Sequence, residues 1–143
     1  MEPSTYSSPA VLRRVELAAL LLVDVVMLIA AFVFYYMARF RWGWLNPGSE
    51  PASPFVAMFL MTGFWIVAFL FSGLYKEKFA PSRFDELALL FKVITVGSLI
   101  VFFVMFGNAL EAGSARPNLL FYWATIFVSV ATGRMLVRSI QQV

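Results

Sequence analysis

The sequence contains no cysteine and no histidine. Without thiols the chain forms no disulfide and offers no thiolate to a metal ion. Without imidazole it has no histidine general base and no histidine ligand for haem or chlorophyll. Most of the side-chain chemistry that enzymes and metalloproteins use is therefore excluded, and we expect no catalytic residue, no metal site and no cofactor.

Charged residues are also scarce, at 13% of the chain, whereas 62% of the residues are hydrophobic and 17% are aromatic. A soluble domain carries about 25% charged residues, so this composition indicates a membrane protein. The 143 residues leave room for one domain of a few spans, since each span takes about 20 residues. The net charge of +3 is small, and nucleic acid is not expected as a partner.

Four apolar segments are long enough to cross a bilayer as helices. They cover residues 15–38, 54–74, 87–108 and 117–137. Pro54 and Pro117 are expected in the first turn of their helices, where proline is tolerated best, while Pro47-Gly48 and Gly113-Ser114 favour turns between spans. The sequence therefore predicts an all-α fold, a single integral membrane domain over residues 1–143 built as a four-transmembrane-helix bundle.

Basic residues are distributed unevenly between the two sides of this topology. One side holds Arg13, Arg14, Lys76, Lys78, Arg83, Lys92, Arg134 and Arg138; the other holds Arg39, Arg41 and Arg116. Cytoplasmic loops carry an excess of lysine and arginine, so this split predicts a multi-pass protein with both termini in the cytoplasm. The loop over residues 40–53 would then face outward, with Trp42 and Trp44 as anchors at headgroup level.

Asp24 is an acidic residue near the middle of the first apolar segment. A carboxylate within a bilayer is costly unless it is paired or protonated, so Asp24 must face protein or water. Two readings are open, a role linked to protons or lipid phosphate and a structural hydrogen bond between helices, and we favour the second. The candidate partners are the hydroxyls of Ser98, Thr95, Thr125 and Ser129, or the charges of Lys92 and Arg134, both expected to lie shallower and snorkel to the headgroups.

The segment over residues 72–87 is the one densely polar stretch between two spans. Ser82 followed by Asp85 has the spacing of a capping box, which predicts that a helix begins near residue 82. Phe84, Leu87, Leu90 and Phe91 would form one apolar stripe of an amphipathic first part of that helix. An ordinary solvated loop is the alternative reading.

Two further patterns have structural and functional readings. Small residues, namely Gly63, Ala68, Ser72, Gly73, Gly97, Ser98 and Gly133, permit close approach of helices. Basic residues along the predicted cytoplasmic side form a rim that would suit a lipid phosphate or the cationic end of a polyprenyl-phosphate or pigment groove, and positive-inside charge alone is the simpler explanation. The rim comprises Arg13, Arg14, Lys76, Lys78, Arg83, Arg134 and Arg138.

Several short motifs resemble the N-terminal membrane domain of bacterial polyprenyl glycosylphosphotransferases, which initiate capsule and exopolysaccharide synthesis. The motifs are Leu22-Val23-Asp24, Ala38-Arg39-Phe40, Gly73-Leu74-Tyr75, Ser82-Arg83-Phe84-Asp85-Glu86-Leu87, Arg116 before an aromatic-rich helix, and Gly133-Arg134-Met135-Leu136-Val137-Arg138. A related pattern also opens membrane-bound nucleotide-sugar dehydratases and epimerases. The residue sequence of the Ser82–Leu87 segment favours the transferase family over the dehydratases and epimerases.

The resemblance implies a four-helix domain of the bacterial inner membrane that precedes a nucleotide-binding-like domain and a catalytic domain, which transfers a sugar phosphate to undecaprenyl phosphate. Neither of these domains is in this sequence, and no catalytic residue is carried over. The chain is then a truncated product or a short paralogue, acting as a membrane anchor or dimerisation domain, with membrane lipid, a second copy and polyprenyl phosphate as partners. The alternative is an accessory subunit that scaffolds a larger membrane complex and binds pigment or lipid.

Overall fold

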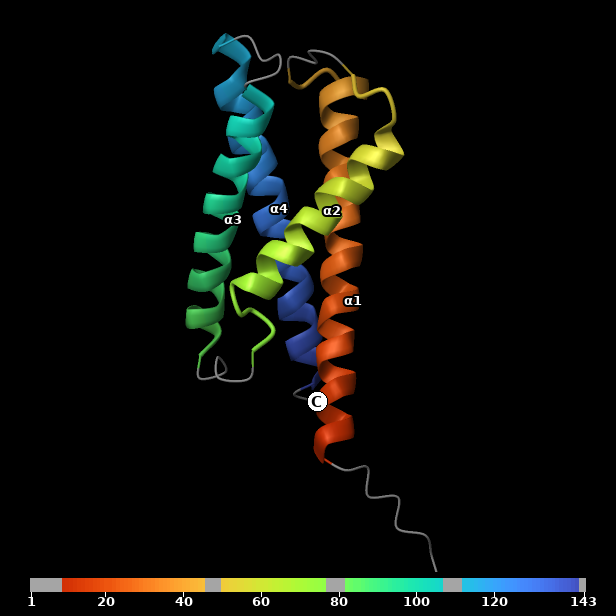
Figure 1. Ribbon diagram of the computed structural model, residues 1–143, viewed down its shortest axis with the longest axis vertical. Helices are drawn as coiled ribbons and strands as arrows, with labels where there is room; N and C mark the ends of the chain where they lie inside the picture. The colour runs from red at the N-terminus through yellow and green to blue at the C-terminus, as the bar shows by residue number, and fades with distance from the viewer. Residues whose placement is uncertain (1–8, 46–49, 77–81, 107–111, 142–143) are drawn as a thin grey trace, which may run out of the picture.

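Long helices make up the fold, and no strand occurs in the residues that the computed structural model describes, 9–45, 50–76, 82–106 and 112–141 (Figure 1). They are α1 (Pro9–Tyr36), which continues as the π-helical stretch η1 (Met37–Arg41), then α2 (Pro54–Phe71), α3 (Arg83–Phe106) and α4 (Ala112–Gln141). All four α-helices are long and apolar enough to cross a membrane. The predicted all-α, four-span membrane fold is confirmed.

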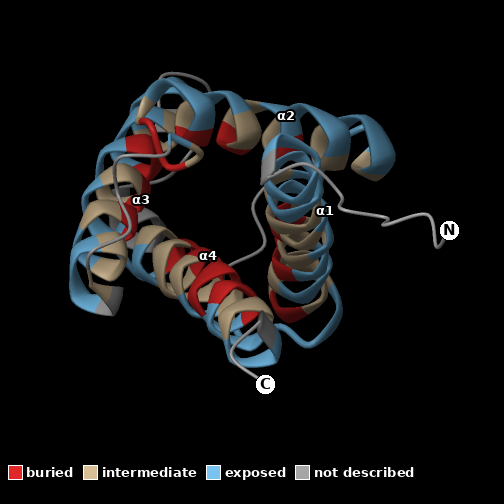
Figure 2. Cartoon of the chain, turned by 90° about the horizontal axis from the view of Figure 1, so that it is seen from below, coloured by how far each residue is buried: buried red, intermediate tan, exposed pale blue. Residues whose placement is uncertain are grey.

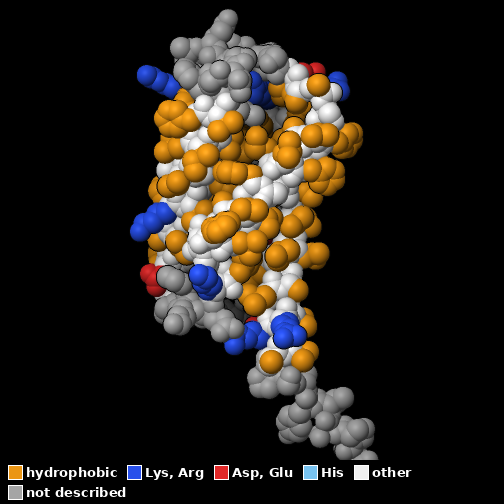
Figure 3. Space-filling view, viewed as in Figure 1, with side chains coloured by type: hydrophobic (Ala, Val, Ile, Leu, Met, Phe, Trp, Pro, Cys, Tyr) orange, Lys and Arg blue, Asp and Glu red, His pale blue; other side chains and the backbone are white. Residues whose placement is uncertain are grey.

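The helices enclose one core. α4 packs against α1 on one side and α3 on the other, while α2 crosses obliquely between the end of α1 and the beginning of α3 (Figure 1). Buried residues face inward from all four helices, and the outer faces are exposed (Figure 2). Hydrophobic side chains cover the middle of the face shown in Figure 3, and lysines and arginines gather mainly toward its two ends. This distribution suits a bundle surrounded by lipid.

The first helix is longer than the sequence predicts. With η1 it forms a continuous helix of 32 residues, Ala10–Arg41, with an apolar stretch long enough to span a membrane. At 1.5 Å per residue this is about 48 Å, well above the ~30 Å of a bilayer's hydrocarbon core. The N-terminal part of α1 extends beyond the other helices (Figure 1). A residue halfway along α1 is therefore not halfway through the bundle.

The two prolines behave differently. Pro54 lies in the first turn of α2 as predicted, behind the N-cap Ser53, whose hydroxyl accepts a hydrogen bond from the Val56 N–H at 3.5 Å. Pro117 was expected in a first turn, and this is wrong, because α4 already begins at Ala112. The predicted turn at Gly113-Ser114 is likewise wrong, since both residues belong to α4. Pro117 removes one hydrogen bond, that to the Gly113 carbonyl, which a 30-residue helix tolerates.

Trp65 of α2 lies at the centre of the core and is 1% exposed. Its indole N–H donates to the Tyr122 hydroxyl of α4 at 2.9 Å, so the buried polar tip is satisfied. Gly97 of α3 makes room for the ring: a Cβ there would lie 2.6 Å from the indole. Gly97 therefore accommodates a side chain of α2, whereas a Cβ at Gly63 would meet nothing within 4 Å.

An aromatic cluster lies at the end of the bundle where α1 ends and α4 begins. Phe34 stacks on Phe121 and meets the edges of Trp42 and Trp44, with ring centroids 5.8–6.3 Å apart. We call this the aromatic end. The predicted turn at Pro47-Gly48 lies outside the described residues.

Candidate functional site

Asp24 and Arg134 form a buried ion pair between α1 and α4. Asp24 is 0% exposed and Arg134 is 3% exposed. The guanidinium approaches the carboxylate with two donors: Nε lies 3.1 Å from Oδ1, and Nη2 lies 2.5 Å from Oδ2. Such a two-pronged contact combines charge with fixed orientation, which a lysine cannot supply.

Three further side chains complete this group. The Tyr75 hydroxyl donates to Asp24 Oδ2 at 2.5 Å. Arg134 Nη1 donates to Glu86 Oε1 at 2.9 Å, and Arg138 pairs with the other oxygen of Glu86. We call Asp24, Tyr75, Glu86, Arg134 and Arg138 the ionic cluster, and the end of the bundle where it lies the ionic end.

The ionic cluster confirms one candidate partner of Asp24 and corrects the others. Arg134 is a partner, as is Tyr75, which was not predicted, whereas the hydroxyls of Ser98, Thr95, Thr125 and Ser129 are not. Lys92 is exposed, so it is not a partner either. Arg134 was expected to snorkel outward, and this is wrong because it is buried. Asp24 also lies near the beginning of α3, because the Arg134 guanidinium that it binds also donates to Glu86 in the first turns of α3.

The Gly73-Leu74-Tyr75 motif positions the tyrosine. Gly73 has φ +76°, a conformation that glycine adopts without strain, and it follows the Ser72 cap of α2. Its N–H bonds to the Leu70 carbonyl, and the Leu74 N–H bonds to the Phe69 carbonyl, both at 3.2 Å. These two bonds define a Schellman motif. Leu74 is buried beside the core, and Tyr75 is thereby directed back toward Asp24.

The segment from Ser82 begins α3 and places Glu86. The Ser82 hydroxyl accepts from the Asp85 N–H at 3.2 Å, as an N-cap does, and donates to the Asp85 carboxylate at 2.7 Å. Asp85 therefore bonds the Ser82 hydroxyl with both its backbone N–H and its side-chain carboxylate. The residues of the predicted apolar stripe do not share one environment, because Phe84 is 85% exposed and Leu90 is 0% exposed. Glu86, one turn into α3, faces α4 instead.

Gly133 brings α4 close to α1 beside the ion pair. A Cβ at this position would lie 2.5 Å from Met27 Cγ and 3.0 Å from Val23 Cγ1, so a larger residue would separate the helices. The close approach predicted for Gly133 is confirmed. Arg134 follows directly, and Arg138 lies one helical turn later on the same face, so that both arginines reach Glu86.

The ionic cluster carries no net formal charge. Two carboxylates face two guanidinium groups, so their formal charges cancel. The Arg134 guanidinium also lies over the Phe69 ring at 5.8 Å and the Tyr75 ring at 5.3 Å. Burial raises the pKa of the Tyr75 hydroxyl, and its bond to Asp24 raises the pKa further, so Tyr75 remains a protonated donor. This arrangement joins helices, as expected for a structural role of Asp24.

Comparison with protein-family models, with curated proteins and with solved structures finds no match for this chain. The ionic cluster and the motifs that build it therefore carry the functional argument.

The predicted basic rim is distributed over three environments. Arg13, Arg14 and Lys76 are exposed. Arg138 is partly exposed and Arg134 is buried, and both line a hollow between α3 and α4. Lys78 and the side chain of Arg83 lie outside the described part of the chain.

Tyr75 and Glu86 were not predicted as partners of the buried charges. A signal for them exists in the sequence, because a carboxylate and an arginine within apolar segments both need partners, and Tyr75 and Glu86 stand in the polar segment between the second and third spans. That signal does not specify which polar residue points inward. The direction depends on the Schellman turn and on the N-cap.

Proposed function

We propose that this chain is a membrane-anchoring and assembly domain of the polyprenyl glycosylphosphotransferase type, with no catalytic role of its own. One observation carries the proposal. Four of the segments that resemble this family each supply a member of the ionic cluster: Asp24 from the first, Tyr75 from the second, Glu86 from the third, and Arg134 with Arg138 from the fourth.

This convergence gives the short motifs a common physical cause. Asp24 and Arg134 are 110 positions apart in sequence and meet in one ion pair. Glycine and serine in the same motifs serve the turn, the cap and the close approach that bring these side chains together. A shared structural requirement of this kind supports common descent better than four unrelated matches of three to six residues.

The proposed setting is the bacterial inner membrane, with both termini in the cytoplasm. The uneven distribution of basic residues supports this orientation. The ionic end then lies toward the cytoplasm, where the enzymatic domains of such transferases are expected. Polyprenyl phosphate remains a proposed partner, and Arg138, at the hollow between α3 and α4, is the cluster residue best exposed to meet its phosphate.

An antibody against this chain, applied to membranes of the source organism, tests the proposal. We expect the antibody to detect a polypeptide larger than 16.1 kDa. The immunoprecipitate should catalyse the transfer of sugar phosphate from a nucleotide sugar to undecaprenyl phosphate. In that enzyme Asp24→Leu should lower the amount assembled in the membrane and leave turnover per assembled enzyme unchanged. A precipitate without transfer activity contradicts the proposal.

The second candidate is an accessory subunit that scaffolds a larger complex. It is favoured by large aromatic side chains on the outer face of α2, with Phe55 72%, Phe59 67% and Phe71 85% exposed. Such side chains contact either lipid or a neighbouring protein. Detection of a 16.1-kDa polypeptide within a pigment-containing or other assembly, without sugar-phosphate transfer, would favour this candidate.

A further inference from the structure

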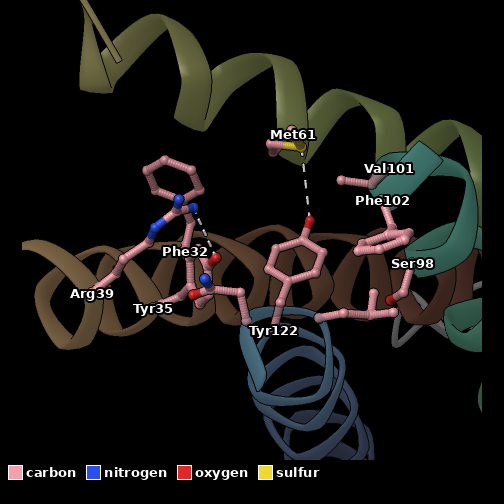
Figure 4. Close-up of a pocket in the computed structure, with 10 residues that line it drawn as sticks. Phe32, Tyr35, Arg39, Met61, Ser98, Val101, Phe102 and Tyr122 are labelled. Atoms are coloured by element: carbon pink, nitrogen blue, oxygen red, sulfur yellow. Dashed lines mark hydrogen bonds between the residues drawn. The ribbon is translucent and has the colours of Figure 1, made fainter. Parts of the chain in front are cut away.

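A hollow lined by residues of all four α-helices lies toward the aromatic end (Figure 4). It has room for water over a volume of about 70 Å³. One buried water needs roughly 10–15 Å³ of such space, so this hollow is large enough for more than one water molecule. Apolar and aromatic side chains form most of its walls. The polar residues that line it are Tyr35, Arg39, Ser98, Asn118 and Tyr122.

The hydroxyl of Ser98, on α3, faces this hollow (Figure 4). Ser98 is 1% exposed, and its hydroxyl has no hydrogen-bond partner within the described chain. Serine and threonine in helices often bond the carbonyl four residues earlier, and Thr95 and Thr125 do so here at 2.7 Å. Ser98 makes no such bond. Buried polar groups are nearly always paired, so an occupant of the hollow is the expected partner.

Tyr122 offers a second hydrogen-bonding group to the same space. Its hydroxyl accepts from the Trp65 indole N–H at 2.9 Å and lies 3.7 Å from the Met61 sulfur. A hydroxyl has two acceptor lone pairs, so the Tyr122 oxygen has capacity for one further bond. Water both donates and accepts, and buried waters typically make about three hydrogen bonds. Water therefore suits the size of the hollow and both of these hydroxyls.

Two apolar layers separate the hollow from the ionic cluster. The inward faces of α3 and α4 each carry a charged residue, two buried apolar residues and a polar residue, one helical turn apart. These are Glu86, Leu90, Ile94 and Ser98 on α3, and Arg134, Val130, Ile126 and Tyr122 on α4. The four apolar residues are at most 3% exposed. At 1.5 Å per residue the 12 positions from Glu86 to Ser98 cover about 18 Å, so a thick apolar layer divides the two polar regions.

We propose that this hollow is a hydrated recess, in which ordered water bonds the Ser98 and Tyr122 hydroxyls, and that the apolar layers keep this water apart from the ionic cluster. The smaller hollow beside Thr62 is a contrast, because its volume of about 10 Å³ is at the limit for a single water. The recess does not depend on the role proposed for the chain as a whole.

Single thiols test the recess, since the chain has no cysteine that would react in the background. The whole chain with Ser98→Cys, in vesicles of phosphatidylethanolamine and phosphatidylglycerol, is treated with methyl methanethiosulfonate. The thiolate attacks the sulfenyl sulfur of this small reagent and releases methanesulfinate, and mass spectrometry follows the methyl disulfide. Val96→Cys is the matched control, because Val96 lies on the outer face of the same helix and is 57% exposed in the bundle. Ser139→Cys, at an exposed position near the end of α4, gives the rate for a hydrated thiol.

We expect Ser98→Cys to react at least about tenfold faster than Val96→Cys, because a thiol in apolar surroundings stays protonated and unreactive. Ile94→Cys, one turn toward the ionic cluster, should be as slow as Val96→Cys. A rate for Ser98→Cys equal to that of Val96→Cys overturns the proposal, whether the hollow is empty or filled by lipid. Fast reaction of Ile94→Cys overturns the separation of the recess from the ionic cluster.

A second measurement uses the parent protein and needs no substitution. Short X-ray pulses split water into hydroxyl radicals, which oxidise the side chains beside bound water. We expect oxidation of Tyr122, which lines the hollow, and little oxidation of Trp65, which is 1% exposed and does not line it. An indole is the more reactive group, so this order would show where the water lies. A parent protein in which Tyr122 stays unoxidised overturns the proposal.

Discussion

The two ends of the bundle handle buried polar groups in opposite ways. At the ionic end every charge of Asp24, Glu86 and Arg134 faces an opposite charge, and the Tyr75 hydroxyl adds a further bond to Asp24. Toward the aromatic end the Ser98 and Thr62 hydroxyls are buried without a partner in the described chain, beside hollows. The ionic end is therefore held together by paired charges between helices. The second end leaves two buried hydroxyls without a partner in the described residues.

The largest effect is expected from Asp24→Leu, which breaks the ionic end. The change leaves the buried Arg134 guanidinium without its main counter-charge, and removing one partner of a buried pair lowers stability by about 3–5 kcal/mol. Thermal or SDS-induced unfolding of the purified protein measures the loss. Glu16→Leu is the control, because Glu16 is an exposed acid on the same helix, and its effect should stay within about 0.5 kcal/mol. Equal effects of the two changes would contradict the role of the cluster.

Tyr75→Phe should have an intermediate effect. It removes only the hydroxyl that donates to Asp24, and a hydrogen bond to a charged group contributes about 1.5–3 kcal/mol. The same unfolding assay applies. The raised pKa of Tyr75 adds a pH test with a definite sign: the folded protein holds this proton above the ordinary tyrosine pKa, so the contribution of Tyr75 is present below that pKa and declines at more alkaline pH. Tyr75→Phe should therefore show a shallower alkaline loss of stability than the parent protein.

Ser82→Ala should have a smaller effect on the same end. It removes the N-cap of α3, which holds the first turn that carries Glu86, and such a loss is about 1 kcal/mol. Unfolding measurements check the value, and Ser82→Asp, which retains a capping oxygen, should restore most of it. If the alanine and aspartate variants were equally destabilised, the cap would not be what holds Glu86 in place.

The smallest effect is a gain in stability, and it is expected from a change toward the aromatic end. Thr62→Val removes a buried hydroxyl that has no partner in the described chain while keeping the shape of the side chain. We expect stability to rise by up to about 1 kcal/mol in delipidated protein, because the desolvation penalty of an unpaired hydroxyl disappears. A loss of 1 kcal/mol or more would mean that this hydroxyl is satisfied.

The sequence is sufficient to predict the architecture and insufficient to predict the contacts. Apolar length specifies four spans because a bilayer admits helices of that length, and the Ser82 start of α3 follows from local capping. Pro117 and Gly113 were misplaced because their turn preference is local and weak beside the extension of α4. Neither the depth of Asp24 nor its pairing with Arg134 is encoded locally. Both depend on how far α1 extends past the bundle and on the close approach at Gly133.

A double-mutant cycle at Asp24 and Arg134 tests the central claim most directly, that this pair is a structural tie between α1 and α4. The free energy of unfolding is measured for Asp24→Leu, Arg134→Met, the double variant and the parent protein. We predict that each single change is strongly destabilising and that the double variant is more stable than either, with a coupling of about 2 kcal/mol or more. Additive effects of the two changes would contradict the account.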